Sequence, residues 1–229
     1  MKPRRLDFYF DFISLYAYFA WRRLLPICDA RGIELVVHPV VFGKLLDHWG
    51  QLGPAEVPPK KTFVYQSAYR YAALHGFAFD PPRSHPFNPL PALRVALVEV
   101  CGDRQREAIN AIFEAGWSNG AEIGTAEALA AILDRAGLDG AALLHTASLP
   151  TAKAALRAET DAAITHGVFG VPTMRIGELL FWGNDQLDHV ALALDGRDPL
   201  DATRVDAMLA RPRAIDRQPR RTRQEPGEA

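Results

Sequence analysis

The amino-acid sequence predicts an α/β protein in which a four-stranded mixed sheet is interrupted by an inserted all-helical segment. Three observations predict this fold class. The first 42 residues read as strand, helix and strand, residues 45–160 have mostly helical periodicity, and residues 168–194 read as strand, strand and helix. A short strand–helix–strand unit places its two strands in parallel. The two flanks can then pair in one sheet, with the helical segment inserted between them.

The first flank contains two predicted strands and one helix. Residues 6–12, LDFYFDF, alternate aromatic and acidic side chains, which indicates a strand. A helix is predicted from Leu15, because the apolar residues that follow have the three-and-four spacing of a buried stripe. We expect Pro26 to kink or break this helix and Gly32 to end it. Residues 33–42, IELVVHPVVF, are rich in β-branched residues and form the second predicted strand.

The central segment contains several stretches of helical period, each closed by a glycine shortly after. Residues 80–94, DPPRSHPFNPLPALR, hold five prolines in 15 residues, so a stiff extended loop is predicted there. Residues 116–120 spell G-x-S-x-G, the pattern of a hydrolase nucleophile elbow, which requires a strand before the serine. The residues before Ser118 have helical period instead, so Ser118 is not predicted to be a nucleophile.

The last flank returns to strand character. Residues 168–182 read as two strands joined by a turn at 176–179, and Asn184 is predicted to cap a final helix that runs to about Leu194. The chain after Ala210 holds six arginines, three acids and three prolines without apolar periodicity, which is typical of disorder. The predicted boundaries are 1–44 and 161–209 for the sheet domain, 45–160 for the helical insertion and 210–229 for a disordered basic tail.

Composition and charge exclude several classes of function. The chain has 229 residues, of which 48% are hydrophobic, and its net charge is -1, so it lacks the strong positive field that recruits nucleic acid or an anionic membrane. Cys28 and Cys101 fit neither a disulfide framework nor a metal site, and Cys28 is predicted to be a small buried residue in or just after a helix. The seven histidines show no metal-binding spacing, and most are expected at the surface or at helix caps. No signal peptide or membrane span is recognisable, so a cytoplasmic location is expected.

Three positions could carry chemistry. Ser14 stands where the first strand meets the first helix, and free N–H groups and the helix dipole favour an anion or thiolate there. A plain helix-capping serine is the alternative. Pro172, at the entrance to a strand, fits either a cis bond or an ordinary trans bond at a strand start. Asp185 lies near a predicted helix start, where an acid is favourable even without a ligand.

Three motifs taken together resemble one family. They are D-F-Y-F-D-F-I-S-x-x-x-Y at 7–18, H-P-F-N-x-L-P-A-L-R at 85–94 and G-V-F-G-V-P-T-M-x-I-G-x-x-x-F-W-G-N-D-Q-L at 167–187. They resemble the 2-hydroxychromene-2-carboxylate isomerases, relatives of the kappa-class glutathione transferases within the DsbA-like branch of the thioredoxin fold. The resemblance covers about residues 5–195. It implies a thioredoxin-like fold interrupted by a helical domain, glutathione as cofactor, a small aromatic substrate and a homodimer.

The resemblance also implies roles for individual residues. The Ser14 hydroxyl would donate a hydrogen bond to the sulfur of bound glutathione and so favour its thiolate. The backbone of Val171, before a cis Pro172, would pair with the cysteinyl part of glutathione as a short β-addition. The resemblance also places Leu15 and Tyr16 beside the glutathione thiol, and Asn184 and Asp185 at its γ-glutamyl end. Gln51 would contact glutathione from a neighbouring loop, and Asn88 would face the second substrate.

Two departures from the family pattern bear on the site. The family usually has proline where this chain has Leu15, which puts the rigidity of that turn and the substrate preference in question. It often has asparagine where this chain has Gln51, which is longer by one methylene.

Three functions remain open from the sequence. The first is a glutathione-dependent isomerase of 2-hydroxychromene-2-carboxylate-type intermediates in aromatic degradation. The second is a kappa-like glutathione transferase or peroxidase, and the third is a non-catalytic thioredoxin-like module that binds peptides. Because residues 14–17 contain no cysteine, dithiol–disulfide exchange at this turn is excluded.

Overall fold

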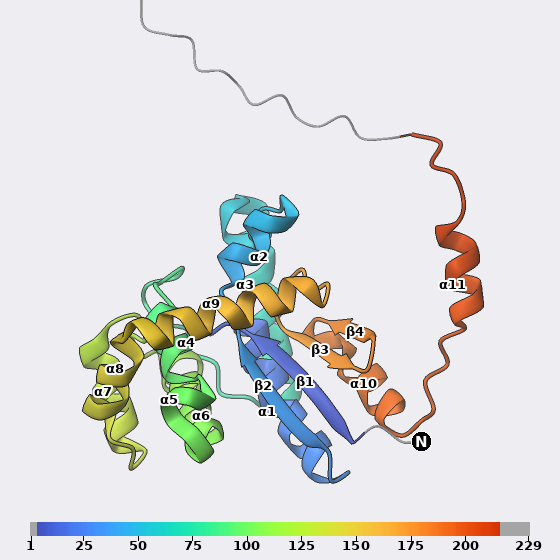
Figure 1. Ribbon diagram of the computed structural model, residues 1–229. Helices are drawn as coiled ribbons and strands as arrows, with labels where there is room; N and C mark the ends of the chain where they lie inside the picture. Colours follow the sequence, from blue (N-terminus) through green and yellow to red (C-terminus); the bar gives the residue numbers. More distant parts are fainter. Residues whose placement is uncertain (1–3, 216–229) are drawn as a thin grey trace, which may run out of the picture. The chain divides into compact units, whose positions relative to one another are not determined.

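The computed structural model describes residues 4–215. They form two compact units, one ending at Arg197 and the other beginning at Asp198. The first unit contains one sheet, whose strands lie in the order β2-β1-β3-β4 (Figure 1). β1 is parallel to β2 and antiparallel to β3, and β3 is antiparallel to β4. The prediction of a four-stranded mixed sheet is therefore confirmed, and its strands are β1 (Arg5–Phe10), β2 (Glu34–Pro39), β3 (Thr173–Ile176) and β4 (Leu179–Trp182).

Helices occupy most of the chain between β2 and β3, as predicted. α1 (Leu15–Asp29) joins β1 to β2, and η4 (Asn184–Gln186) and α10 (Leu187–Leu194) follow β4. The second unit contains α11 (Ala202–Leu209). The elements between β2 and β3 are α2 (Phe42–Trp49), η1 (Pro54–Glu56), α3 (Pro58–His75), α4 (Leu90–Val95), α5 (Val98–Cys101), η2 (Gly102–Arg104), α6 (Gln105–Phe113), the π-helical turn η3 (Glu114–Ser118), α7 (Ala126–Arg135), α8 (Gly140–Ser148) and α9 (Pro150–Thr165).

The alternation in β1 separates two different faces of the sheet. On one face the aromatic and aliphatic side chains are fully buried, and the Phe8 ring stacks on Trp21 of α1 at 5.9 Å. On the other face, which α9 crosses (Figure 1), Tyr9 packs in a small apolar cluster with Ala163. Acidic side chains share this second face because successive strand residues point to opposite sides. The residues of the first face are Leu6, Phe8 and Phe10, and those of the second are Asp7, Tyr9 and, just beyond the strand, Asp11.

Several predicted boundaries need correction. β1 ends at Phe10 rather than at 12, because the chain turns at Asp11, whose carboxylate accepts from the Ile13 N–H of that turn and from the Phe42 N–H at the start of α2. α1 continues unbroken through Pro26, which lies near its end on an exposed side, where the missing N–H costs least. The predicted loop 80–94 gives way to α4 at Leu90, because Pro91 stands in the first helical turn, where proline is tolerated.

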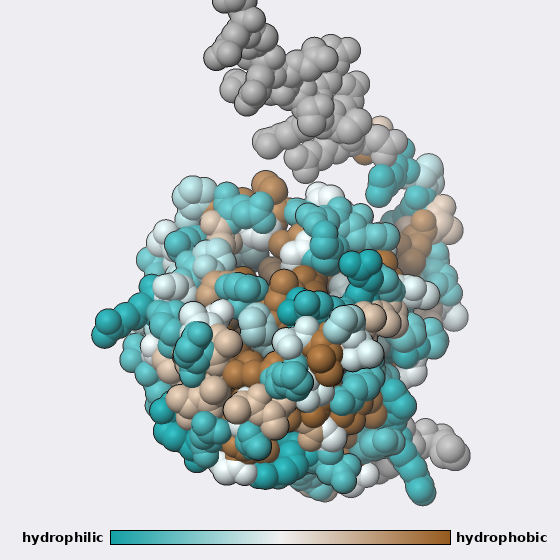
Figure 2. Space-filling view, turned by 60° about the vertical axis from the view of Figure 1, so that its left-hand side comes forward, coloured by the Kyte–Doolittle hydropathy of each residue, from teal (hydrophilic) through white to brown (hydrophobic). Residues whose placement is uncertain are grey.

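The predicted basic tail, 210–229, falls largely outside the described residues, which end at 215. Figure 2 shows one face of the molecule, on which hydrophobic side chains form separate patches between hydrophilic ones. This distribution is ordinary for a protein surface. None of the described helices is both long and apolar enough to cross a membrane.

Candidate active site

Ser14 lies at the junction of β1 and α1. Its backbone is extended (φ -92°, ψ 110°), and its Oγ accepts a hydrogen bond from the Ala17 N–H at 3.2 Å, so it caps the helix. The capping alternative is therefore real, but it uses only the acceptor capacity of the hydroxyl. The hydroxyl proton remains available to donate. Ser14 is half-buried, so a ligand can reach it.

The second element of the site is the cis peptide bond between Val171 and Pro172. The cis form implied by the family resemblance is confirmed. The Ser14 hydroxyl faces the Val171 carbonyl oxygen at 3.5 Å, across 157 residues of sequence. At this distance the contact is weak, and the hydroxyl can turn to a better acceptor. The fold thus brings Ser14 and the cis-proline segment together.

A third segment, the turn that follows β4, lies beside the cis-proline segment. The Gly183 N–H donates to the Pro172 carbonyl oxygen at 2.9 Å. Gly183 has φ +105°, a backbone conformation that favours glycine, and a Cβ there would lie 2.4 Å from the Asp185 Oδ1 and displace that carboxylate. Asp185 is exposed and Asn184 is buried, and η4, which they begin, packs against α1.

The prediction that Asn184 caps the final helix is wrong. Asn184 is the first residue of the 3-10 turn η4, and α10 begins only at Leu187, with Gln186 in the capping position. The extra turn arises because the Gln186 N–H donates to the Gly183 carbonyl oxygen at 3.2 Å, which is the i to i+3 bond of a 3-10 turn, before the α-helical hydrogen bonds start. Asn184 therefore lies at the base of the turn rather than at a free helix end.

Leu15 and Tyr16 follow Ser14 in the first turn of α1. The Leu15 side chain is buried in the core, with 3% of its surface exposed, so it can offer a ligand only its backbone. Tyr16 is half-buried and packs against the same core. The N–H groups of both residues lie in the first helical turn, where no intrahelical acceptor exists. These two amides are donors for an anion beside Ser14.

Gln51 follows α2 and is exposed. α2 is fixed at both of its ends to segments of the site. At its start, the Phe42 N–H donates to Asp11 at 2.9 Å, and at its end, the Trp49 indole N–H donates to the Val168 carbonyl oxygen at 3.0 Å. No hydrogen bond among the described residues joins the Gln51 side chain to Ser14. Gln51 is thus an exposed residue directly after a helix whose two ends are tied to Asp11 and Val168.

The proline-rich loop before α4 reaches the site through a residue that sequence reasoning missed. The predicted substrate residue Asn88 is exposed, and its side chain accepts a local bond from the Leu90 N–H at 3.1 Å. Three residues earlier, the His85 Nε2 lies 3.0 Å from the Ile13 carbonyl oxygen, directly before Ser14. The signal in the sequence that could have identified His85 is its position as the first residue of the H-P-F-N motif.

A buried carboxyl group lies behind the Ser14 turn. Asp11 is 1% exposed, and its two oxygens accept from the backbone N–H groups of Ile13 at 3.0 Å and Phe42 at 2.9 Å. Burial raises the pKa of Asp11 to about 7, although the two backbone hydrogen bonds act in the opposite direction. Asp11 thereby ties the Ser14 turn to the start of α2.

Two other residues considered in the sequence, Ser118 and Cys28, contribute no reactive group to the site around Ser14. Ser118 ends the π-helical turn η3, which follows α6, and bonds to the Tyr18 hydroxyl at 2.6 Å, so its predicted helical context is confirmed. Cys28 is buried within α1, as predicted, and burial raises the pKa of its thiol to about 11. Within residues 4–215, no group of three or more histidine, cysteine or acidic side chains could hold a metal ion.

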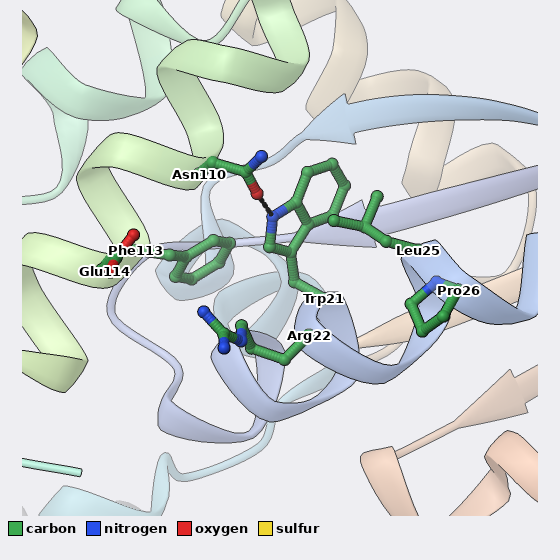
Figure 3. Close-up of a pocket in the computed structure, with 7 residues that line it drawn as sticks. All are labelled: Trp21, Arg22, Leu25, Pro26, Asn110, Phe113 and Glu114. Atoms are coloured by element: carbon green, nitrogen blue, oxygen red, sulfur yellow. Dashed lines mark hydrogen bonds between the residues drawn. The ribbon is translucent and has the colours of Figure 1, made fainter. Parts of the chain in front are cut away.

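A cavity of about 310 Å³ lies between α1 and α6, away from the Ser14 turn (Figure 3). In Figure 3, the Asn110 side chain points to the Trp21 indole, whose N–H it accepts at 2.5 Å. Trp21 stands seven residues after Ser14, about two helical turns along α1. The cavity therefore belongs to a different part of the surface, and its lining residues are Trp21, Arg22, Leu25, Pro26, Asn110, Phe113 and Glu114.

Comparison with known proteins adds to this geometry. Residues 5–195 match the family model of the DSBA-like thioredoxin domain. A 2-hydroxychromene-2-carboxylate isomerase of Pseudomonas putida is 28% identical over 185 residues, which are 80% of this chain and 90% of that protein. Glutathione S-transferase kappa 1 of Rattus norvegicus is 23% identical over 210 residues, 84% of this chain and 91% of that protein.

Among solved structures, a 2-hydroxychromene-2-carboxylate isomerase superposes with a TM-score of 0.76 at 26% identity. The match covers 90% of this chain and 100% of that one. The helical segment between β2 and β3 is therefore part of the shared architecture rather than an addition peculiar to this chain.

Proposed function

This chain belongs to the family of DSBA-like thioredoxin domains, and on that premise we propose that it is a glutathione-dependent isomerase of 2-hydroxychromene-2-carboxylate-type compounds. The isomerase class follows from its similarity to proteins of that name, in sequence and in structure. The dependence on glutathione and the role of Ser14 are our extension from the geometry of the site.

One observation carries the proposal. A serine hydroxyl stands at the first turn of a helix beside a cis-proline edge, and its proton makes only a weak contact, at 3.5 Å, with the Val171 carbonyl oxygen. A thiolate placed beside them would meet the Ser14 hydroxyl and the first N–H groups of α1, and both favour the charged form. Because Ser14 carries a hydroxyl rather than a thiol, this arrangement can activate the thiol of a ligand but cannot form a disulfide with it.

The donors and acceptors around this point fit glutathione. The Ser14 hydroxyl and the amides of Leu15 and Tyr16 suit the sulfur. The Val171 backbone beside Pro172 suits an extended cysteinyl residue, and the exposed Asp185 carboxylate suits an ammonium group. The chemistry that bound glutathione supplies is reversible addition of a thiolate to the conjugated double bond of the substrate, with rotation before the thiolate leaves. The protein's part is to orient thiolate and acceptor and to keep the thiol ionised.

The test compares the wild type with Ser14→Ala. We expect the purified wild type to isomerise 2-hydroxychromene-2-carboxylate with catalytic amounts of glutathione, and the variant to lose about 100-fold in kcat/KM, the range seen when one transition-state hydrogen-bond donor is removed. The absorbance of bound thiolate, followed against pH, should show the thiol ionising below its free pKa in the wild type and less so in the variant.

A matched control separates chemistry from helix capping. Thr125 caps α7 through the same kind of bond, from the Ala128 N–H at 3.3 Å. Thr125→Ala should cost about 1 kcal/mol of unfolding free energy, like any lost cap, and leave turnover unchanged. Accumulation of a glutathione conjugate would identify a kappa-like transferase instead. Peptide binding without glutathione binding or turnover would identify a binding module and overturn the proposal.

The resemblance extends the proposal to the partners of the chain. We expect a small aromatic substrate at the Ser14 edge and a homodimer in solution. Sedimentation equilibrium of the full chain measures the second point directly, and a monomeric mass at micromolar concentration would contradict it.

A further inference from the structure

The peptide bond that precedes Ser14 is held at both of its polar groups. Its N–H, on Ser14, donates to the Asp11 carbonyl oxygen at 3.1 Å. Its C=O, on Ile13, lies 3.0 Å from the His85 Nε2. A peptide unit is planar, so two opposed hydrogen bonds fix the orientation of the whole unit. That plane fixes the N–Cα bond of Ser14. Together with the Ser14 φ of -92° and the hydrogen bond of its Oγ with the Ala17 N–H, it sets the position of the Oγ.

The two holding groups come from different parts of the chain. Asp11 directly follows β1, so its bond is local to the turn. His85 lies in the proline-rich loop, 72 residues away in sequence, and reaches the turn from the helical segment. The helical segment therefore supplies one of the two anchors of the Ser14 backbone.

The surroundings of His85 determine which of its nitrogens carries the proton. A carbonyl oxygen can only accept, so the Nε2 must be protonated and donate to Ile13. Three aromatic rings enclose the imidazole, at centroid distances of 5.9 Å for Tyr65, 6.1 Å for Phe87 and 5.5 Å for Trp117. The Nδ1 is buried and has no hydrogen-bond partner among the described residues. A second proton there would be left without an acceptor.

The charge environment also keeps the ring neutral. Burial lowers the pKa of His85, and repulsion from Lys61 on α3 lowers it further, against the opposing effect of the hydrogen bond to Ile13. Because its only free nitrogen is buried, His85 cannot exchange protons with a substrate. It is suited to hold a backbone group rather than to act as an acid or base.

We propose that His85 is a positioning residue for the Ser14 hydroxyl, which it aligns by hydrogen bonding to the Ile13 carbonyl. This inference rests on the proposed function, because alignment of Ser14 matters only if that hydroxyl activates a thiol. It assigns to the helical segment a direct part in thiol activation, in addition to any part in binding the second substrate.

The first measurement uses the wild-type chain. Nitrogen-15 spectra of the histidine imidazoles should show His85 as the neutral tautomer protonated at Nε2 between pH 6 and 8, with glutathione bound and without it. An imidazolium, or a tautomer protonated at Nδ1, would overturn the proposal. This readout is independent of turnover and of the folding of any variant.

The second measurement compares two variants. His85→Phe keeps an aromatic ring but removes the donor, whereas the Gln Nε2 of His85→Gln can replace the histidine Nε2. We expect His85→Phe to lower kcat about tenfold, to leave the KM for glutathione within twofold, and to raise the pKa of the bound thiol. His85→Gln should recover most of kcat and of the thiol pKa. The control is His75→Phe. The His75 ring lies tilted against Tyr71, with 4.2 Å between the ring centroids, and this variant should behave as the wild type.

The outcomes separate this inference from the proposed function. If Ser14→Ala changes the thiol pKa but His85→Phe does not, the role of His85 is refuted and the proposed function stands. Equal losses in His85→Phe and His85→Gln, with a rising KM, would mark a general packing defect and also refute it. If Ser14→Ala itself has no effect on the bound thiol, the proposed function falls, and the inference falls with it.

Discussion

Asp7 and Asp11 lie four residues apart on the same side of the β1 segment, and both are buried, yet their surroundings are opposite. Asp7 contacts three basic side chains, with Arg5 at 2.6 Å, His38 at 3.1 Å and Arg175 at 3.7 Å. Within residues 4–215, the Asp11 carboxylate accepts hydrogen bonds from backbone N–H groups alone. Burial alone would raise the pKa of Asp7, but hydrogen bonds from Arg5 and His38 outweigh it and lower that pKa. Burial raises the pKa of Asp11 to about 7.

The difference shows that the two carboxyl groups, Asp7 in β1 and Asp11 just after it, have different roles in the protein. The charged partners of Asp7 join the sheet to α9, because His38 also bonds Glu159 at 2.7 Å. Asp11 joins the turn before α1 to the start of α2. Its carboxyl group, with a pKa of about 7, is close to changing its charge at neutral pH. The first carboxylate stabilises the fold, and the second holds the residues from which the site is built.

Stability measured against pH should separate the two carboxyl groups most strongly. An unfolded aspartate has a pKa near 3.9, so folded Asp11 binds a proton more tightly than the unfolded chain does. The stability that wild type gains over Asp11→Asn should therefore be largest below about pH 4 and decline as the pH rises to about 7. The shift sets an upper limit of about 4 kcal/mol on this decline.

Asp7→Asn provides the opposite case. Because the pKa of folded Asp7 is lowered, the stability that wild type gains over this variant should be present above about pH 4 and be lost as the pH falls further. Chemical denaturation of the three proteins from pH 2 to 8 measures both profiles. Parallel profiles for the two variants would refute the distinction between the two groups.

Removal of the Asp11 side chain should have the next largest effect. Asp11→Ala leaves the N–H groups of Ile13 and Phe42 buried without acceptors, at about 1–3 kcal/mol each. We expect a loss of about 3 kcal/mol in unfolding free energy at pH 7, together with a weaker thiol activation. Asp139→Ala is the control, because that exposed carboxylate accepts a single backbone bond from Ala142, and its loss should cost about 1 kcal/mol. Equal costs for the two variants would contradict the role assigned to Asp11.

The smallest effect should come from a change at Glu159, whose carboxylate bonds the same His38 ring that bonds Asp7. Burial opposes protonation of His38, but hydrogen bonds from its ring to Glu159 and Asp7 raise its pKa overall. Glu159→Gln should lower the His38 pKa and cost less than about 1 kcal/mol, since Glu159 is partly exposed. The cost should appear below about pH 6.5 and vanish as the pH rises through the folded pKa of His38. Proton NMR of the histidine ring follows this titration, and an unchanged His38 pKa would show that Glu159 does not contribute.

Much of the fold was predictable from local patterns. The alternation of residues 6–12 and the β-branched run after Gly32 indicate strands because each side chain sits on one face of a half-buried sheet. Ser14 and the segment at 167–187 were found as candidates because their residue types are distinctive at those positions. The start of α10 was misplaced because the 3-10 bond from the Gln186 N–H to the Gly183 carbonyl oxygen, which precedes the helix, leaves no distinct signal in the residue types there.

The supporting residues of the site were harder to predict because they act over long distances in sequence. Asp11 fits the acidic positions of an alternating strand, and nothing local indicates that its second oxygen binds Phe42, 31 residues later. His85 lies in a loop without periodicity, and its contact with Ile13 depends on how the helical segment folds back. Asn88, three residues on, shares the motif but uses its side chain to start α4.

The strand order also has a consequence for the synthesis of this protein. β1 lies between β2 and β3, but β3 begins at Thr173, long after β1 ends at Phe10. At translation rates of about 5–20 residues per second, the ribosome needs roughly 8–30 s to supply the strand that covers this edge of β1. During that interval the nascent chain carries an unpaired edge rich in aromatic residues, which is a site for mispairing with other chains. Molecular chaperones that shield nascent chains would have their clearest task here, before the last quarter of the protein leaves the ribosome.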